Sequence, residues 1–109
     1  MKIIFKKIVD STPSFEEYIE KKLSPIQKLV KNFEKENEIE LLLDVIRTTK
    51  HHVKGDEIFM VQGSLQLNKK IVRAEEYASD ARLAIDKFCD TLKVEINKYK
   101  NQLDELNKK

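Results

Sequence analysis

The chain contains few of the residues that characterise cross-linked, metal-binding or membrane proteins. It has one cysteine, Cys89, two glycines, two prolines and no tryptophan in 109 residues. A single cysteine excludes an internal disulfide. The chain has only two histidines, His51 and His52, which are adjacent to each other, and together with Cys89 they lack the spacing of a zinc site. Lys6 and Lys7 interrupt the apolar start before it reaches signal-peptide length, and no apolar run approaches the about 20 residues of a membrane span. We therefore expect a cytoplasmic protein with no metal, no cofactor and no membrane contact.

A large excess of charge of either sign is also absent. The sequence has 21 basic and 19 acidic residues, a formal net charge of +2, so overall charge does not indicate a nucleic-acid-binding protein. Its length, with 40% hydrophobic and 37% charged residues, predicts one domain, residues 1–109, with a single core and a densely charged surface. No glycine-rich phosphate loop and no histidine–carboxylate pair at helical spacing occurs, so we expect no enzyme.

Four segments rich in β-branched and apolar residues indicate strands: residues 2–9, 39–49, 58–67 and 71–77. The short connections between the last three predict an antiparallel meander, and the near-continuous leucines of the second predict a central position. Gly55 is the turn residue of the loop 50–57 between the second and third strands. Gly63 predicts a bulge in the third strand or a point of close backbone approach.

The first of two amphipathic helices begins after the first strand. Thr12 suits the N-cap and Pro13 the first helical position, and apolar residues then recur every three or four positions to about residue 33. Pro25 falls inside this pattern, where proline removes a hydrogen bond and clashes with the preceding turn. We therefore expect a kink or short break near Ser24, which would cap a restarted helix.

The second helix spans about residues 80–106, with Ser79 or Asp80 as its cap. At 1.5 Å per residue it is longer than a domain of this size, so residues 101–109 are expected to project or fray. The element order β-α-β-β-β-α predicts an α+β fold, a four-stranded sheet with two helices packed on one face.

Basic residues form two stripes on these helices. Arg82, Lys93 and Lys100 fall within about 20° of one another on the second helix. On the first helix, the residues opposite the apolar face are Lys21, Lys28, Lys31 and Lys35. If both helices lie on one face of the sheet, the stripes rim one groove that suits a phosphate backbone. From spacing alone the same residues fit a solvated surface better than an RNA-binding one, because acidic residues lie near the second stripe and lysines complement helix C-termini.

Three segments carry a resemblance to a known family: "STPSFEEYIEKKL", "HHVKGDEIF" and "LNKKIVRAEEYASDARLAIDKFCDTLKVEINKYK". They resemble the ribosome hibernation promoting factors, also called ribosome-associated inhibitors or sigma-54 modulation proteins. The resemblance covers nearly the whole chain. It rests on the Thr-Pro helix start, the Arg-Ala-Glu-Glu strand and the spacing of Asp80, Ala84, Ile85, Asp86, Asp90, Leu92, Ile96, Lys98 and Lys100. Nothing here corresponds to the second domain of longer members, so the chain resembles either the short form or an excised N-terminal domain of a longer member.

The resemblance implies a protein of the small ribosomal subunit in resting or stressed cells. It would lie in the channel of messenger and transfer RNA, contact 16S ribosomal RNA through both helices and inhibit translation. It would be a monomer off the ribosome and would not bind DNA. The implied RNA contacts are Lys21, Lys28, Lys31, Lys35, Arg73, Arg82, Lys93, Lys98 and Lys100.

The last helix departs from the family pattern. Ala81 and Arg82 occupy positions where many members have Met-Tyr, so a charge replaces an aromatic residue. Usual basic residues are missing at Thr91, Val94 and Asn97, while Lys93 stands where an acid is common. The RNA-facing side of this helix is therefore expected to be shifted around its axis.

An alternative function is a general structured-RNA-binding or protein-interaction module of similar fold without ribosome specificity. Double-stranded RNA-binding domains share a strand meander and a terminal helix, but Asp80 and Asp86 occupy the region where their last helix begins with lysines. Among other residues, we interpret His51 and His52 as exposed loop residues, and Cys89 and Tyr99 as core residues.

Overall fold

The computed structural model describes residues 1–9, 12–34, 38–48 and 58–107. Its elements are β1 (Lys2–Ile8), α1 (Pro13–Val30), a short 3-10 turn η1 (Lys31–Phe33), β2 (Glu40–Thr48), β3 (Ile58–Leu67), β4 (Lys70–Ala78) and α2 (Ala81–Asn107). Lys35, the loop with His51, His52 and Gly55, and residues 108–109 lie outside the described residues.

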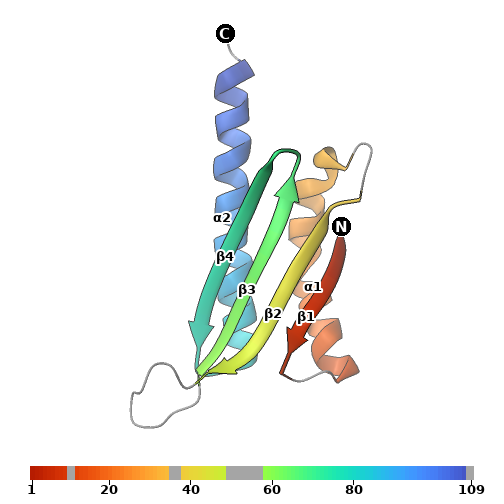
Figure 1. The fold of residues 1–109 in the computed structure, drawn as a ribbon, viewed down its shortest axis with the longest axis vertical. Helices are drawn as coiled ribbons and strands as arrows, with labels where there is room; N and C mark the ends of the chain where they lie inside the picture. The colour runs from red at the N-terminus through yellow and green to blue at the C-terminus, as the bar shows by residue number, and fades with distance from the viewer. Residues whose placement is uncertain (10–11, 35–37, 49–57, 108–109) are drawn as a thin grey trace.

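The four strands form one sheet in the order β1-β2-β3-β4 (Figure 1). β1 runs parallel to β2, because α1 connects them, while β2, β3 and β4 form an antiparallel meander. The predicted α+β fold and the meander are therefore confirmed. β2 is an interior strand, as its run of leucines indicated.

Both helices lie on one face of this sheet, and the core fills the space between the two layers (Figure 1). Along β2, Leu41, Leu43 and Val45 are buried on the helix side, and Leu42 is exposed on the other. Two surfaces result. We call the outward side of α1 and α2 the helix surface, and the uncovered side of the sheet the open face.

The N-terminus of α1 has the predicted cap. Thr12 Oγ1 accepts a hydrogen bond from the backbone N of Phe15 at 3.3 Å, and Pro13 occupies the first position. Of the predicted kink or short break near Ser24, the break is wrong, because α1 is continuous from Pro13 to Val30 with Pro25 inside it. Leu23 and Ile26, each 1% exposed, anchor the turns on both sides of the proline, so tertiary packing outweighs the lost hydrogen bond.

Gly63 marks a close approach between the sheet and α2. A Cβ atom at this position would lie 2.7 Å from Cζ of the buried Phe88 ring. β3 pairs with both neighbours without a register shift, so of the two predicted roles the close approach is confirmed. The irregularity in this sheet lies instead in β1, between Phe5 and Lys7.

α2 extends well past the end of the sheet (Figure 1). Asp80 caps it, since Asp80 Oδ2 accepts a hydrogen bond from Leu83 N at 3.3 Å. The helix continues to Asn107, and the longest dimension of the molecule is 54 Å against 28 and 18 Å for the others. No helix in the described part of the chain is long and apolar enough to cross a membrane.

Candidate nucleic-acid interface

α1 and α2 are held together by polar contacts along their outer edges. Tyr18 donates a hydrogen bond to Asp86 Oδ1 at 2.6 Å, and Lys22 Nζ lies 3.4 Å from the same oxygen. Nearer the other end of α1, Lys100 Nζ donates to the backbone oxygen of Leu29 at 3.3 Å. These contacts fix the spacing of the helices, and therefore the spacing of any basic side chains that rise from both.

The basic residues of α1 point away from the sheet. Lys21 and Lys28 lie about 160° to 180° around the helix from the centre of its buried stripe, and both are exposed. Lys31 is also exposed, in the 3-10 turn that follows α1. None of these three lysines forms an ion pair with a described residue.

On α2, Arg82 and Lys93 lie on the side that faces α1 and are exposed. Lys93 and Lys22 border a hollow of about 360 Å³ between the helices, together with Asp86 and Asp90. The groove between the helices therefore contains charges of both signs. Lys21 and Lys28 do not line this hollow and lie on the outward side of α1.

Tyr18 is the centre of a cluster in this groove. Its hydrogen bond to Asp86, with a smaller contribution from burial, raises the pKa of Tyr18 to about 12, and Arg82 partly opposes this effect. The Arg82 guanidinium carbon lies 4.7 Å from the centre of the Tyr18 ring, and Lys22 Nζ lies 5.8 Å from it. The phenol therefore stays protonated at neutral pH between two cations.

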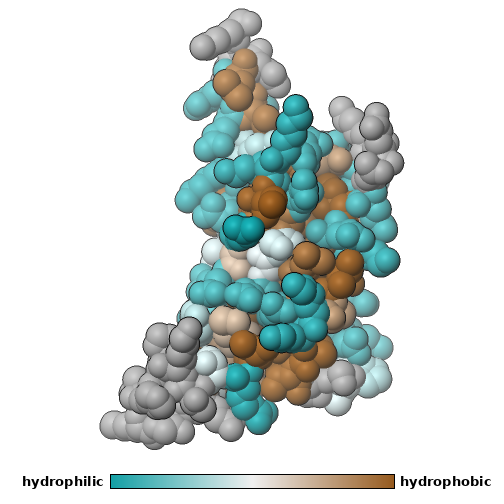
Figure 2. All heavy atoms as spheres, in the orientation of Figure 1, coloured by the Kyte–Doolittle hydropathy of each residue, from teal (hydrophilic) through white to brown (hydrophobic). Residues whose placement is uncertain are grey.

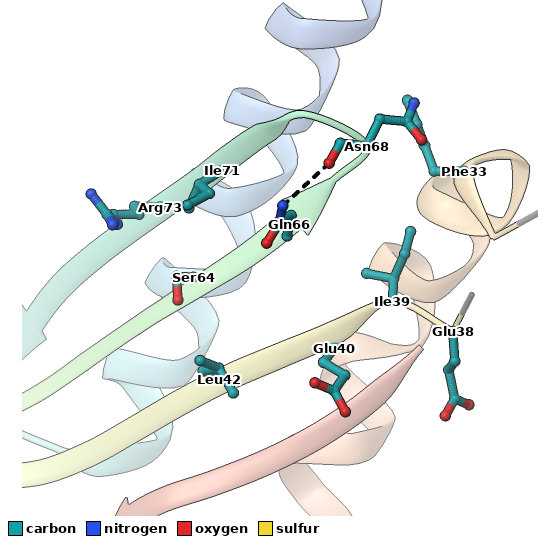
Figure 3. Close-up of a pocket in the computed structure, with 10 residues that line it drawn as sticks. All are labelled: Phe33, Glu38, Ile39, Glu40, Leu42, Ser64, Gln66, Asn68, Ile71 and Arg73. Carbon is teal, nitrogen blue, oxygen red and sulfur yellow. Dashed lines mark hydrogen bonds between the residues drawn. The ribbon is translucent and has the colours of Figure 1, made fainter. Parts of the chain in front are cut away.

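Three of the residues implied as RNA contacts are not among the exposed, unengaged basic residues of the helix surface. Lys100 is engaged with Leu29 at the C-terminal end of α1, where a cation complements the helix dipole. Lys98 lies on the side of α2 turned away from α1 and is 3.5 Å from Glu95. Arg73 is on the open face, opposite the helix surface (Figure 3).

The open face is itself hollowed, as Figure 3 shows for its upper part. Two adjoining hollows, of about 750 and 480 Å³, share Leu42, Ser64 and Arg73 in their linings. In the smaller one Asp44 accepts a hydrogen bond from Gln62 at 2.9 Å, while its other carboxylate oxygen is buried and has no hydrogen-bond partner among the described residues. Figure 2 views this face and shows hydrophobic patches separated by hydrophilic side chains. The mixture does not resemble a phosphate-binding surface.

Chemically reactive groups are scarce in the part of the chain that the structure describes. Cys89 is 9% exposed, and burial, followed by the nearby Asp86 and Asp90, raises its pKa to about 12, so the thiol is inert as predicted. Tyr99 is partly buried and stacks on Phe33 with 5.9 Å between ring centres, which confirms its packing role. The described residues contain no group of three His, Cys, Asp or Glu side chains that could hold a metal.

Sequence reasoning missed the Tyr18 cluster. Tyr18 has the spacing of the apolar stripe, so it was counted with the core, and Lys22 was not singled out. Tyr18 and Asp86 are 68 positions apart, and no local pattern indicates such a pair. The side of the sheet on which Arg73 lies could be predicted from the sequence. Alternation along β4 puts Val72 and Ala74 on the helix side and Arg73 on the other.

Comparison with protein families matches residues 1–104 to the family described as "Sigma 54 modulation protein / S30EA ribosomal protein". The chain belongs to this family. The match spans β1 to most of α2 and confirms the resemblance drawn from the sequence segments. By its description, the family consists of ribosome-associated proteins.

Two solved structures share the fold. The N-terminal domain of Protein Y from Thermus thermophilus has a TM-score of 0.64 at 21% identity, over 90% of this chain and 94% of that chain. A ribosomal subunit interface protein from Coxiella burnetii has a TM-score of 0.62 at 20% identity, over 93% and 99%. A search of curated protein sequences gave no match.

Proposed function

We propose that this protein binds the small ribosomal subunit in the channel of messenger and transfer RNA and inhibits translation in resting or stressed cells. The observation that carries the proposal is the helix surface of a chain from this family. There, two neighbouring helices present the exposed basic residues Lys21, Lys28, Arg82 and Lys93, and Lys31 is exposed in the 3-10 turn that follows α1. No bond is made or broken, because occupancy of the channel is sufficient.

The physical basis is phosphate contact. A folded RNA can be recognised by its shape and backbone charge without reading base edges. Basic side chains on two helices at a fixed spacing suit such a backbone, and counterion release makes the binding depend on salt. The open face, with its mixed charges and its exposed Leu42 and Ile71, offers no comparable surface.

The departures of α2 from the family pattern agree with a shifted contact side. Val94 and Asn97 are exposed on the outer side of α2, and Val94 is 51% exposed. The basic residues Arg82 and Lys93 lie instead toward α1. We infer that RNA contacts concentrate over the groove between the helices and not along the outer side of α2.

The test uses separated ribosomal subunits. The protein should cosediment with small subunits and not with large ones, and small subunits loaded beforehand with messenger and initiator transfer RNA should bind it poorly. Addition to a cell-free system should reduce translation. Equal binding to small subunits and to an unrelated structured RNA would instead support a general RNA-binding module.

A further inference from the structure

Arg82 differs from the other basic side chains of α2 in how it is held. The central carbon of its guanidinium lies 4.7 Å from the centre of the Tyr18 ring, within the range of a cation–π contact. Yet Arg82 is exposed and forms no hydrogen bond or ion pair with the described residues. A guanidinium carries five N–H donors in a planar fork, so all of them are available to a ligand.

Two nearby cations are already engaged within the protein. Lys22 is 3.4 Å from Asp86, and Lys87 donates to the backbone oxygen of Tyr77 at 3.1 Å. The contact with the Tyr18 ring therefore restrains Arg82 without using any of its N–H donors. Those donors are the groups that bind a phosphate bidentately.

The ring under Arg82 is itself fixed. Tyr18 is tied to Asp86 by a 2.6 Å hydrogen bond, and Asp86 is also approached by Lys22. Both contacts compensate the charge of Asp86, which would otherwise repel an anion one helical turn from Arg82. Tyr18 thus restrains the arginine and keeps the nearest carboxylate occupied.

We propose that Arg82 is a preorganised phosphate-binding residue for RNA and that Tyr18 is its positioning residue. The proposal deepens the function above and rests on it only for the source of the phosphate. An unrestrained arginine loses side-chain entropy when it binds, and the Tyr18 ring has removed part of that freedom beforehand. In this chain an aromatic residue on α1 supports a charge on α2, where many family members carry the aromatic residue on α2 itself.

The direct test is a titration followed by NMR. The sequence has three arginines, Arg47, Arg73 and Arg82, whose side-chain Nε–H signals can be assigned by substitution. On addition of a short RNA duplex, the Arg82 signal should move and saturate, while that of Arg73 on the open face should not. Inorganic phosphate should move the Arg82 signal at much higher concentration. An Arg82 signal that stays in place, or moves no more than that of Arg73, would overturn the proposal.

A mutant cycle separates positioning from folding. Arg82→Gln should weaken RNA binding about tenfold, and Tyr18→Leu about threefold in the wild-type background. Tyr18→Phe, which keeps the ring but loses the bond to Asp86, should retain most of the affinity. Tyr18→Leu should have no further effect when Arg82 is already Gln, because it acts through Arg82. Equal losses in both backgrounds would show that Tyr18 only supports the fold.

The outcomes distinguish this proposal from the proposed function. If the Arg82 signal responds to RNA but the protein does not bind small subunits, the ribosomal role fails and the phosphate-binding residue stands. If the protein binds small subunits and Arg82→Gln binds them equally well, the ribosomal role stands and this proposal fails.

Discussion

At the scale of single residues, two close contacts join positions that are far apart in the sequence: Gly63 with Phe88, and Tyr18 with Asp86. Gly63 was predicted to be a bulge or a close approach, and the side chain that approaches it, Phe88, lies on a helix 25 positions further along. No local pattern names such a partner. The same holds for Tyr18, whose spacing indicated burial and whose hydroxyl instead meets Asp86 across two helices.

Substitution of Gly63 tests the close approach. In Gly63→Ala, the new methyl group would lie 2.7 Å from Phe88 Cζ and 3.2 Å from the backbone oxygen of Leu42. Because Phe88 is fully buried, we expect a loss of about 1 to 3 kcal/mol in the free energy of unfolding. Denaturant unfolding measures it. Ser64→Ala, one residue along on the open face, is the control and should change stability by no more than about 0.5 kcal/mol. Equal stability of the two variants would contradict the close approach.

The ionisation of Tyr18 tests its bond to Asp86. Its pKa is raised from 10.0 to about 12 in the folded protein, so the bond's contribution to stability is complete below about pH 10 and is lost as the pH rises toward 12. Absorbance titration should show a phenol that ionises near pH 12 and disappears in Tyr18→Phe. The hydrogen bond from Tyr77 to Glu75 raises the pKa of Tyr77 as well, so Tyr77→Phe is titrated in parallel to separate the two phenols. Asp86→Asn should return the pKa of Tyr18 toward 10.0. A phenol ionising near pH 12 that persists in Tyr18→Phe would contradict this assignment.

At the scale of elements, the order and ends of the strands and helices followed from the sequence because local signals determine them. Thr12 with Pro13 and Asp80 mark helix starts, and both caps form. The prediction of a break near Ser24 was wrong because long-range packing, and not a local signal, decides the structure there. The local cost of Pro25 is real, but Leu23 and Ile26 pack into a core whose existence local patterns do not reveal.

The continuity of α1 makes a prediction about Pro25. Replacing it with Ala restores one backbone hydrogen bond, worth part of the about 3 kcal/mol that separates Pro from Ala in a helix interior. The more flexible unfolded chain offsets up to about 1 kcal/mol. We therefore expect Pro25→Ala to raise the free energy of unfolding by about 2 kcal/mol in denaturant melts. Ser24→Ala should be nearly neutral. A destabilised Pro25→Ala would indicate that the helix does restart at this point.

At the scale of the whole molecule, charge is arranged by surface. A net charge of +2 gave no sign of this, because acidic and basic residues nearly balance along the chain. The helix surface carries Lys21, Lys28 and Lys93, whereas the open face carries Lys6, Lys7 and Arg73 beside Asp44 and Glu75. Helical periodicity predicted the first group. The second group includes a residue implied as an RNA contact, and only the layer structure separates the two surfaces.

Two triple variants with identical charge test which surface binds RNA. One changes Lys21, Lys28 and Lys93 to Glu, and the other changes Lys6, Lys7 and Arg73 to Glu. All six residues are exposed, so both variants should fold, as circular dichroism would verify. Each substitution changes the charge by −2, so both variants have a formal net charge of −4 against +2 in the wild type. Any difference between them therefore comes from position and not from net charge.

The helix-surface variant should lose cosedimentation with small subunits and inhibition of cell-free translation, while the open-face variant should keep both. Single substitutions in the first group should reduce the slope of log affinity against log salt by about one for each phosphate contact removed. Lys100 is left unchanged in both variants because it caps α1, and its loss would mix folding with binding. If the open-face variant lost binding and the helix-surface variant kept it, RNA would contact the sheet. The lysines of the helix surface would then be ordinary solvated residues, which is the alternative interpretation of the two basic stripes.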